Sequence, residues 1–331
     1  MKTRFYTIIF FATILLSAFS AKGESPRRIS LPDCSALDLV KAAFEKVEDN
    51  FPAENYLMEA FYRENISREG YSISFNEAIL GIGKSSYKNS ASDRVAVRKA
   101  RTTMPFLSGG DSVMVKLQGG PYSALMTDLV KKSLPGSGKD CCDLNDKYMF
   151  WYGDTEYLNG SPFITVIFDQ RYPEEELLCR GKIFIEPESY AIGRIEFNLN
   201  VENRKDSYQT FVKSKPSSMR IDVKRASYTV NYKKFIDKWY MSSSESEVDL
   251  YVKWNKKSID NNYTLKSQLA VVDFIAGDIS SEKDKVLKQS QFLSEFANSD
   301  SSAKDWEMLN MTLNRLFAQK SSSPETNLLV N

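Results

Sequence analysis

The chain of 331 residues contains no histidine, and this limits the chemistry that it can perform. Hydrolysis by Ser-His-Asp or Cys-His arrangements, acid–base catalysis by imidazole and the common His-containing zinc sites are excluded. A glycosidase that uses two carboxylates, or a Ser-Lys hydrolase, stays compatible with the sequence because neither needs imidazole. We therefore expect a protein that is not an enzyme and that carries no cofactor.

Three short segments could bind ions, but each has an ordinary structural explanation. Residues 174–176 are consecutive glutamates, although successive side chains diverge and solvated loops often have this composition. Asp143, Asn145 and Asp146 resemble the opening of a calcium loop without its glycine and closing glutamate. Gly119-Gly120 could offer backbone amides to an anion, but such a pair is more often a turn into a helix. We expect no metal site.

The four cysteines are Cys34, Cys141, Cys142 and Cys179. In an oxidising compartment an even number permits two disulfides, with three connectivities. Adjacent cysteines more often bond to distant partners than to each other, and Cys179 follows two leucines, which fits a buried free thiol. The sequence predicts a disulfide from Cys34 to Cys141 or Cys142, with Cys34–Cys142 as the candidate pair.

Residues 148–152 read Tyr-Met-Phe-Trp-Tyr and form the most prominent aromatic run. On a strand, Phe150 and Tyr152 would lie on one face and Met149 and Trp151 on the other. Together with Phe163, Phe150 and Trp151 could line an apolar pocket for a lipid or a glycan, because aromatic side chains dominate such sites. Ordinary packing in the core or at a sheet edge explains the run equally simply.

Residues 1–20 have the composition of a secretory signal peptide. Lys2 and Arg4 precede an apolar run, and Ala18 and Ser20 occupy the −3 and −1 positions of a cleavage site. The run is shorter than the roughly 18–20 residues of a membrane span, and no cysteine marks a lipoprotein anchor. The sequence predicts an exported protein of the periplasm or cell surface, without a transmembrane segment after cleavage.

The remaining chain has an almost balanced charge. Two of the 44 basic residues and none of the 43 acidic ones lie in residues 1–20, which leaves no overall positive field to attract nucleic acid or anionic lipid. We expect a polar leader at 21–34, a single domain at 35–318 and a disordered tail at 319–331.

Three segments carry apolar residues at helical spacing: 35–49, 121–134 and 306–317. Ser35 is a candidate N-cap for the first, with Asp38 in its first turn. Pro121 suits the first turn of the second. Residues 202–218 have the composition of a charged loop.

Most of the chain between these segments alternates apolar and polar residues with period two, as in residues 57–64, 71–76, 194–199 and 248–252. Turn signals separate the runs at hairpin spacing, at residues 159–162, 186–189 and 233–237. We count about ten to twelve strands, and a sheet of that size must curl. The predicted fold class is α+β, a large curved antiparallel sheet with helices covering its concave face.

A set of short segments occurs together in one family of exported proteins: residues 36–50 before Phe51-Pro52, 59–64, 71–78, Ala100-Arg101, 119–121, 181–186, 190–192 and Lys238-Trp239-Tyr240. By these segments the chain resembles the carboxypeptidase-like regulatory domain-containing proteins of Gram-negative bacteria, without the β-sandwich that often precedes this region. Residues 181–192 also resemble outer-membrane lipoprotein carriers of the LolA type. That resemblance implies a half-barrel sheet and a lipid cavity.

Three functions follow as hypotheses. The first is a non-enzymatic envelope protein that binds a lipid, another apolar ligand or an envelope protein partner. The second is a glycan-binding protein, or a glycan-active one that uses two carboxylates. The third is a protein–protein interaction module that uses an uncovered sheet edge.

Overall fold

The structure, a computed structural model, describes residues 31–103, 116–117, 120–138, 143–173, 175–202, 204–275, 286–289, 291, 293–296 and 303–317. The predicted signal peptide, most of the predicted leader and the predicted tail at 319–331 lie outside these residues, so the three assignments stay predictions. In the part of the chain that the structure describes, no helix is long and apolar enough to cross a membrane.

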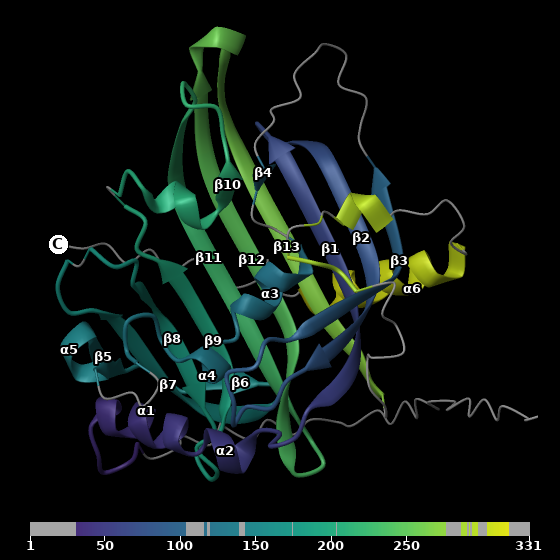
Figure 1. Cartoon of the computed structure of the whole chain (residues 1–331). Coiled ribbons are helices and arrows are strands. Elements are labelled where there is room, and N and C mark those ends of the chain that lie inside the picture. Colours follow the sequence, from purple (N-terminus) through teal and green to yellow (C-terminus); the bar gives the residue numbers. More distant parts are fainter. Residues whose placement is uncertain are drawn as a thin grey trace, which may run out of the picture.

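An open sheet of eleven antiparallel strands forms the body of the protein, which confirms the predicted fold class (Figure 1). Ten strands lie in the order β3-β2-β1-β13-β12-β11-β9-β8-β7-β5, and β6 pairs with β7. Their bounds are β1 Tyr56–Arg68, β2 Tyr71–Lys84, β3 Arg94–Thr103, β5 Tyr148–Tyr152, β6 Glu156–Leu158, β7 Ser161–Gln170, β8 Cys179–Ile185, β9 Ile192–Leu199, β11 Arg220–Phe235, β12 Lys238–Trp254 and β13 Ile259–Ile275.

The sheet has an inner and an outer face, which β1 illustrates. Ala60 and Tyr62 belong to the main buried cluster, whereas Phe61 belongs to a separate cluster on the opposite face. The main cluster takes side chains from strands at both ends of the sheet, such as Val97 of β3 and Phe168 of β7. Strands so far apart share one core because the sheet curls around the helices that fill its inner face (Figure 1).

The first predicted helix forms as α1 (Ala36–Glu45) and α2 (Val47–Asn50). The predicted cap is confirmed, since the Ser35 hydroxyl accepts a hydrogen bond from the Asp38 amide at 3.1 Å. The bulk of the apolar stripe of α1 is buried in the main cluster.

The predicted helix at 121–134 is two short helices, α3 (Pro121–Met126) and α4 (Leu129–Lys132). The break has a local cause: the Asp128 carboxylate caps α4 by accepting the Lys131 amide. The apolar stripe survives the break, because Leu125 and Leu129 are both buried in the main cluster. The four-residue α5 (Leu144–Lys147) leads directly into β5.

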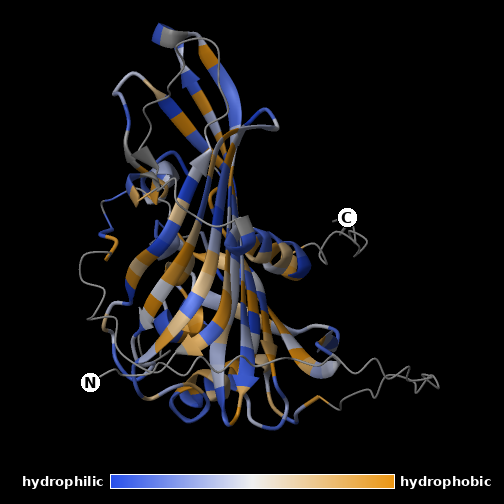
Figure 2. Ribbon diagram, turned by 90° about the vertical axis from the view of Figure 1, so that its right-hand side faces the viewer, coloured by the Kyte–Doolittle hydropathy of each residue, from blue (hydrophilic) through white to orange (hydrophobic). Residues whose placement is uncertain are grey.

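The third helix, α6 (Ala303–Phe317), lies on the outer face, so the helices are not confined to the concave side (Figure 2). Trp306, Leu309 and Leu313 pack against Phe61 and neighbouring apolar residues there. Beneath α6, Arg63 and Arg101 both pair with the buried carboxylate of Glu77. The Arg101 guanidinium also lies over the ring of Trp306, 4.5 Å from the ring centroid, and this contact ties α6 to the sheet.

The segment predicted as a charged loop at 202–218 covers the inner face near one end of the sheet. It contains η1 (Ser207–Thr210) and β10 (Val212–Ser214), which pairs with β4 (Lys116–Leu117). Phe211 and Val212 are buried in a second cluster with side chains of β11, β12 and β13. The few apolar residues of this charged segment therefore hold it against the inner face of the sheet.

Candidate functional site

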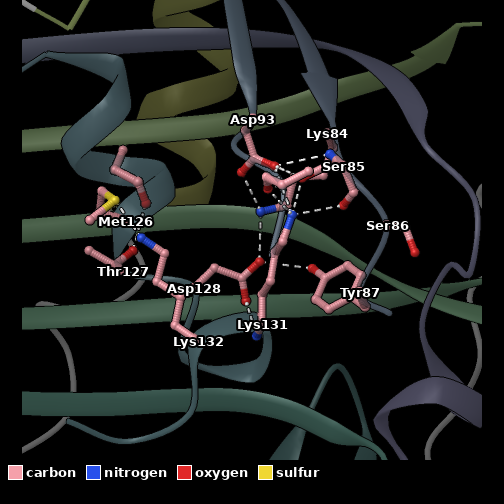
Figure 3. A network of polar contacts seen from close by, with 12 residues as sticks. Lys84, Ser85, Ser86, Tyr87, Asp93, Met126, Thr127, Asp128, Lys131 and Lys132 are labelled. Carbon is pink, nitrogen blue, oxygen red and sulfur yellow. Dashed lines mark hydrogen bonds and ion pairs between the residues drawn. The ribbon is translucent and has the colours of Figure 1, made fainter. Parts of the chain in front are cut away.

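The most concentrated group of charges is a buried ion cluster. Lys84, Asp93, Asp128 and Tyr87 form it (Figure 3), together with Tyr232. The Lys84 ammonium at the end of β2 lies 2.8 Å from a carboxylate oxygen of Asp93 and 2.8 Å from one of Asp128. The hydroxyl groups of Tyr87 and Tyr232 donate to the two oxygens of Asp128, at 2.9 and 2.7 Å.

Burial and charge act against each other in this cluster. Burial alone would lower the pKa of Lys84, but the carboxylates of Asp128 and Asp93 outweigh it and raise that pKa above its ordinary value. Burial alone would raise the pKa of Asp93, but the Lys84 ammonium and the bonds to Lys84 and Ser85 lower it. Lys84 and Asp93 are therefore both held in their ionised forms around neutral pH.

The buried ion cluster is a scaffold for the fold. The side chains of Lys84 and Asp128 are completely buried, and both oxygens of Asp128 are already bonded to protein groups. A substrate would have no access and no free group to react with. What the cluster does is join β2, β11 and the start of α4, which fixes the inner helices on the sheet.

A groove of about 350 Å³ lies on the outer face beside Phe317 of α6. Glu245 and Glu247 line it two residues apart on β12, a spacing that would suit a pair of catalytic carboxylates. Lys266 stands between them, however, 3.2 Å from Glu245 and 3.8 Å from Glu247, and Arg225 pairs with Glu247 as well. The place that a scissile bond would need is occupied by the lysine.

The two edges of the sheet differ in how they are covered. At the β3 edge, the Leu287 amide donates to the Val95 carbonyl at 2.8 Å, and Val286 forms a bridge with Ala96. The β5 edge has a different environment. Trp151 of β5 is 43% exposed and Met149 is 41% exposed, so large apolar side chains reach solvent there.

Backbone hydrogen bonds show which residues of β5 point to its open side. The Lys147 carbonyl accepts from the Arg171 amide, and the Gly153 amide donates to the Thr165 carbonyl, both at 2.8 Å. Thr165 belongs to β7 and Arg171 directly follows it, so residues 147 and 153 both bond to the β7 side. In an antiparallel strand, every second residue bonds to the same neighbouring strand. The residues at positions 149 and 151 therefore also bond to β7.

Phe150 and Tyr152 consequently direct their backbone N–H and C=O groups away from the sheet. Within the described ranges, these backbone groups have no protein partner. We call residues 149–152 the aromatic edge. Tyr157 of β6, which also pairs with β7, is exposed as well.

The structure places the three predicted pocket residues differently from one another. Phe150 is half-buried and packs on Phe168 with ring centroids 6.3 Å apart. Trp151 is on the opposite face of β5, as the alternation predicts. Phe163 is buried and makes an edge-to-face contact with Trp239 at 6.1 Å. Phe150 and Trp151 thus share the aromatic edge, Phe163 lies apart from it, and the pocket itself stays a prediction.

The predicted disulfide also stays a prediction, since Cys141 and Cys142 lie outside the described residues. Cys34 is exposed, with its sulfur 3.7 Å from the Tyr152 hydroxyl. Cys179 is buried next to the Tyr148 hydroxyl, and burial raises the pKa of its thiol to about 12.

No group of three or more acidic or cysteine side chains converges on a metal position among the residues that the structure places. Of the acidic segments considered above, Glu174 lies outside those residues. Asp143 precedes α5, and Asp146 lies within it.

Sequence reasoning missed the buried ion cluster. Its one local signal is Lys84, which directly follows the apolar run Ile79 to Gly83. A lysine at the end of such a run requires a buried counter-charge, but the sequence does not identify Asp93 or Asp128 as its source.

No protein-family model matches the chain. No curated protein sequence matches it either. Among solved structures, the chain is remotely similar to a LolA superfamily protein from Nitrosomonas europaea, with 9% identity, a TM-score of 0.31, and coverage of 75% of this chain and 96% of that chain. It is also similar to a DUF1329 family protein from Desulfovibrio piger, with 10% identity, a TM-score of 0.29, and coverage of 75% of this chain and 95% of that chain. A third similar structure is the Pseudomonas aeruginosa MucA/MucB complex, with 10% identity, a TM-score of 0.21, and coverage of 72% of this chain and 94% of that chain.

Membership of the carboxypeptidase-like regulatory family stays a prediction.

Proposed function

We propose that this protein is a non-enzymatic binding module of the bacterial cell envelope, and that it binds an extended segment of another protein along the aromatic edge. The observation that carries the proposal is the outward-facing backbone of Phe150 and Tyr152 between exposed apolar side chains. A polypeptide strand supplies N–H and C=O groups at the matching spacing, which neither an acyl chain nor a sugar does. Met149 and Trp151 would then contact alternate side chains of the added strand.

The length of the edge limits the affinity. The Tyr148 amide is already bonded to Leu144, and its carbonyl accepts the Arg171 guanidinium at 3.3 Å. Two residues thus offer their backbone groups, and the exposed aromatic rings must supply much of the binding energy. This arrangement fits a reversible partner better than a permanent one.

Site-specific photo-crosslinking tests this proposal. A photoreactive phenylalanine analogue replaces Trp151 in the exported chain, and the crosslinked product is identified by mass spectrometry. We expect one protein to be captured through an extended, apolar segment, and capture to be lost in the double variant with Met149→Lys, because a charge on an edge strand opposes strand addition.

The matched control places the same analogue at Tyr71, which is 78% exposed and far from β5 in the sheet order. Equal products from both positions, or no product at Trp151, would contradict partner binding at this edge.

An apolar ligand on the inner face is the second candidate. The helices fill the part of this face near α1, α3 and α4, but Ile66 of β1 is half-buried without belonging to either inner cluster. Native mass spectrometry of the gently extracted protein tests this function. A lipid that co-purifies, and that is displaced by Ile66→Asp, would favour it; a ligand-free mass would count against it.

A further inference from the structure

The hairpin that joins β11 to β12 carries an exposed apolar tip. Phe235 pairs with Lys238, so the turn consists of Ile236 and Asp237 alone. Phe235 is 51% exposed and Ile236 is 84% exposed. Two adjacent large apolar side chains at the end of a hairpin are costly to keep in water, and such surfaces commonly contact a partner.

The backbone of this turn strengthens the argument. Ile236 has φ 58°, in the left-handed region that favours glycine and strongly disfavours β-branched residues. It is the one β-branched residue among the six described non-glycine residues with positive φ. A glycine would form the same turn without strain, so packing and turn geometry do not explain the isoleucine. Strain at an exposed position points to a function for the side chain.

The tip rests on a firm base. The Phe235 ring lies 5.5 Å from the ring of Phe274 and 6.3 Å from that of Tyr240, measured between centroids. Tyr240 in turn contacts Tyr56. The hairpin therefore presents its apolar tip without having to order itself when a partner binds.

The charges around the tip indicate the chemistry of that partner. Lys233 and Lys234 are exposed and form no ion pair within the described part of the chain. Lys238, on the other strand, donates to the Asp49 carbonyl. The nearby carboxylate of Asp49 is already paired with Lys46 at 2.8 Å. Asp237 lies in the turn itself, so three lysines against one carboxylate leave the apolar tip with a net positive rim.

We propose that the tip of the β11–β12 hairpin docks on a lipid bilayer with anionic headgroups. Phe235 and Ile236 enter the boundary between headgroups and acyl chains, and the lysines contact the headgroups. The apolar point and the cationic rim are the two elements that interfacial binding requires together.

Flotation with lipid vesicles tests the proposal on the mature chain. We expect binding to vesicles of phosphatidylcholine with 30% phosphatidylglycerol and little binding to pure phosphatidylcholine. Ile236→Gly removes the apolar side chain and the strain together, so the variant folds at least as well but loses most vesicle binding. Lys233→Gln and Lys234→Gln each weaken binding about fivefold at low salt.

Tyr71→Ser is the matched control, because it removes an exposed aromatic side chain from a different hairpin turn, and its binding is expected to equal that of the unaltered chain. The proposal would be overturned by no binding of the unaltered chain to either vesicle, by equal binding to both vesicles, or by full binding of Ile236→Gly. Concentration-dependent dimerisation that Ile236→Gly abolishes, without vesicle binding, would assign the tip to a second copy instead and would equally overturn it.

Discussion

At the scale of single residues, the buried ion cluster dominates the energetics. Lys84 has two carboxylate partners inside the protein, and each partner is bonded to further groups. Such a cluster contributes less net stability than its contacts suggest, because three charges lose their hydration. Removing one partner is a different matter, since it leaves the remaining charges buried without compensation.

Lys84→Met is therefore expected to lower the free energy of unfolding by about 3–5 kcal/mol, measured by urea denaturation at pH 7. Lys88→Met is the matched control, because Lys88 is a half-exposed lysine four residues away and its loss changes stability by at most about 0.5 kcal/mol. A loss below about 1 kcal/mol in Lys84→Met would show that the cluster is not buried as described.

The same cluster predicts acid sensitivity. The pKa of Asp93 is lower in the folded protein than its ordinary value of 3.8, so its contribution is complete above that value and is lost as pH falls through the folded pKa. The raised pKa of Lys84 acts at the alkaline end, where its contribution is present below 10.5 and is lost as pH rises through the folded pKa. We expect unfolding free energy to fall below about pH 4, and Asp93→Asn to flatten that part of the curve.

At the scale of elements, the sequence predicted the regular parts of the fold and missed the exceptions. Period-two alternation located β12, whose burial alternates along most of its length, and parts of β1 and β2, although residues 76–82 of β2 are buried without alternation. It missed the break between α3 and α4, since α3 ends at Met126 and Asp128 caps α4 while the apolar stripe continues. It also could not tell that α6 lies on the outer face, because an apolar stripe identifies a covered surface but not which surface.

The placement of α6 gives a test on two neighbouring side chains. Leu309 is completely buried against the outer face, whereas Met308 is exposed. Leu309→Ala is expected to cost about 2–5 kcal/mol of unfolding free energy or to release the helix locally, which amide hydrogen exchange detects. Met308→Ala is expected to stay within about 0.5 kcal/mol of the unaltered protein. Equal effects would mean that α6 does not pack in this orientation.

At the scale of the whole molecule, the open sheet determines what the protein can bind. Its inner face is filled near the helices, one edge is covered by residues 286–287, and the β5 edge keeps outward-facing backbone groups. The aromatic run was evident in the sequence, but its position at an edge was not. That position depends on β5 pairing with β7 and, among the described strands, with no second neighbour. Likewise, the buried ion cluster joins residues from 84 to 232, a proximity that only the topology creates.

Residue-resolved amide hydrogen exchange along β5 tests the central claim most directly, first on the protein alone and then with the partner captured through Trp151. We predict fast exchange at Phe150 and Tyr152 and slow exchange at Met149 and Trp151 in the free protein, with Phe150 and Tyr152 becoming protected in the complex. Protection of all four amides in the free protein, or unchanged fast exchange at Phe150 and Tyr152 in the complex, would contradict strand addition at this edge.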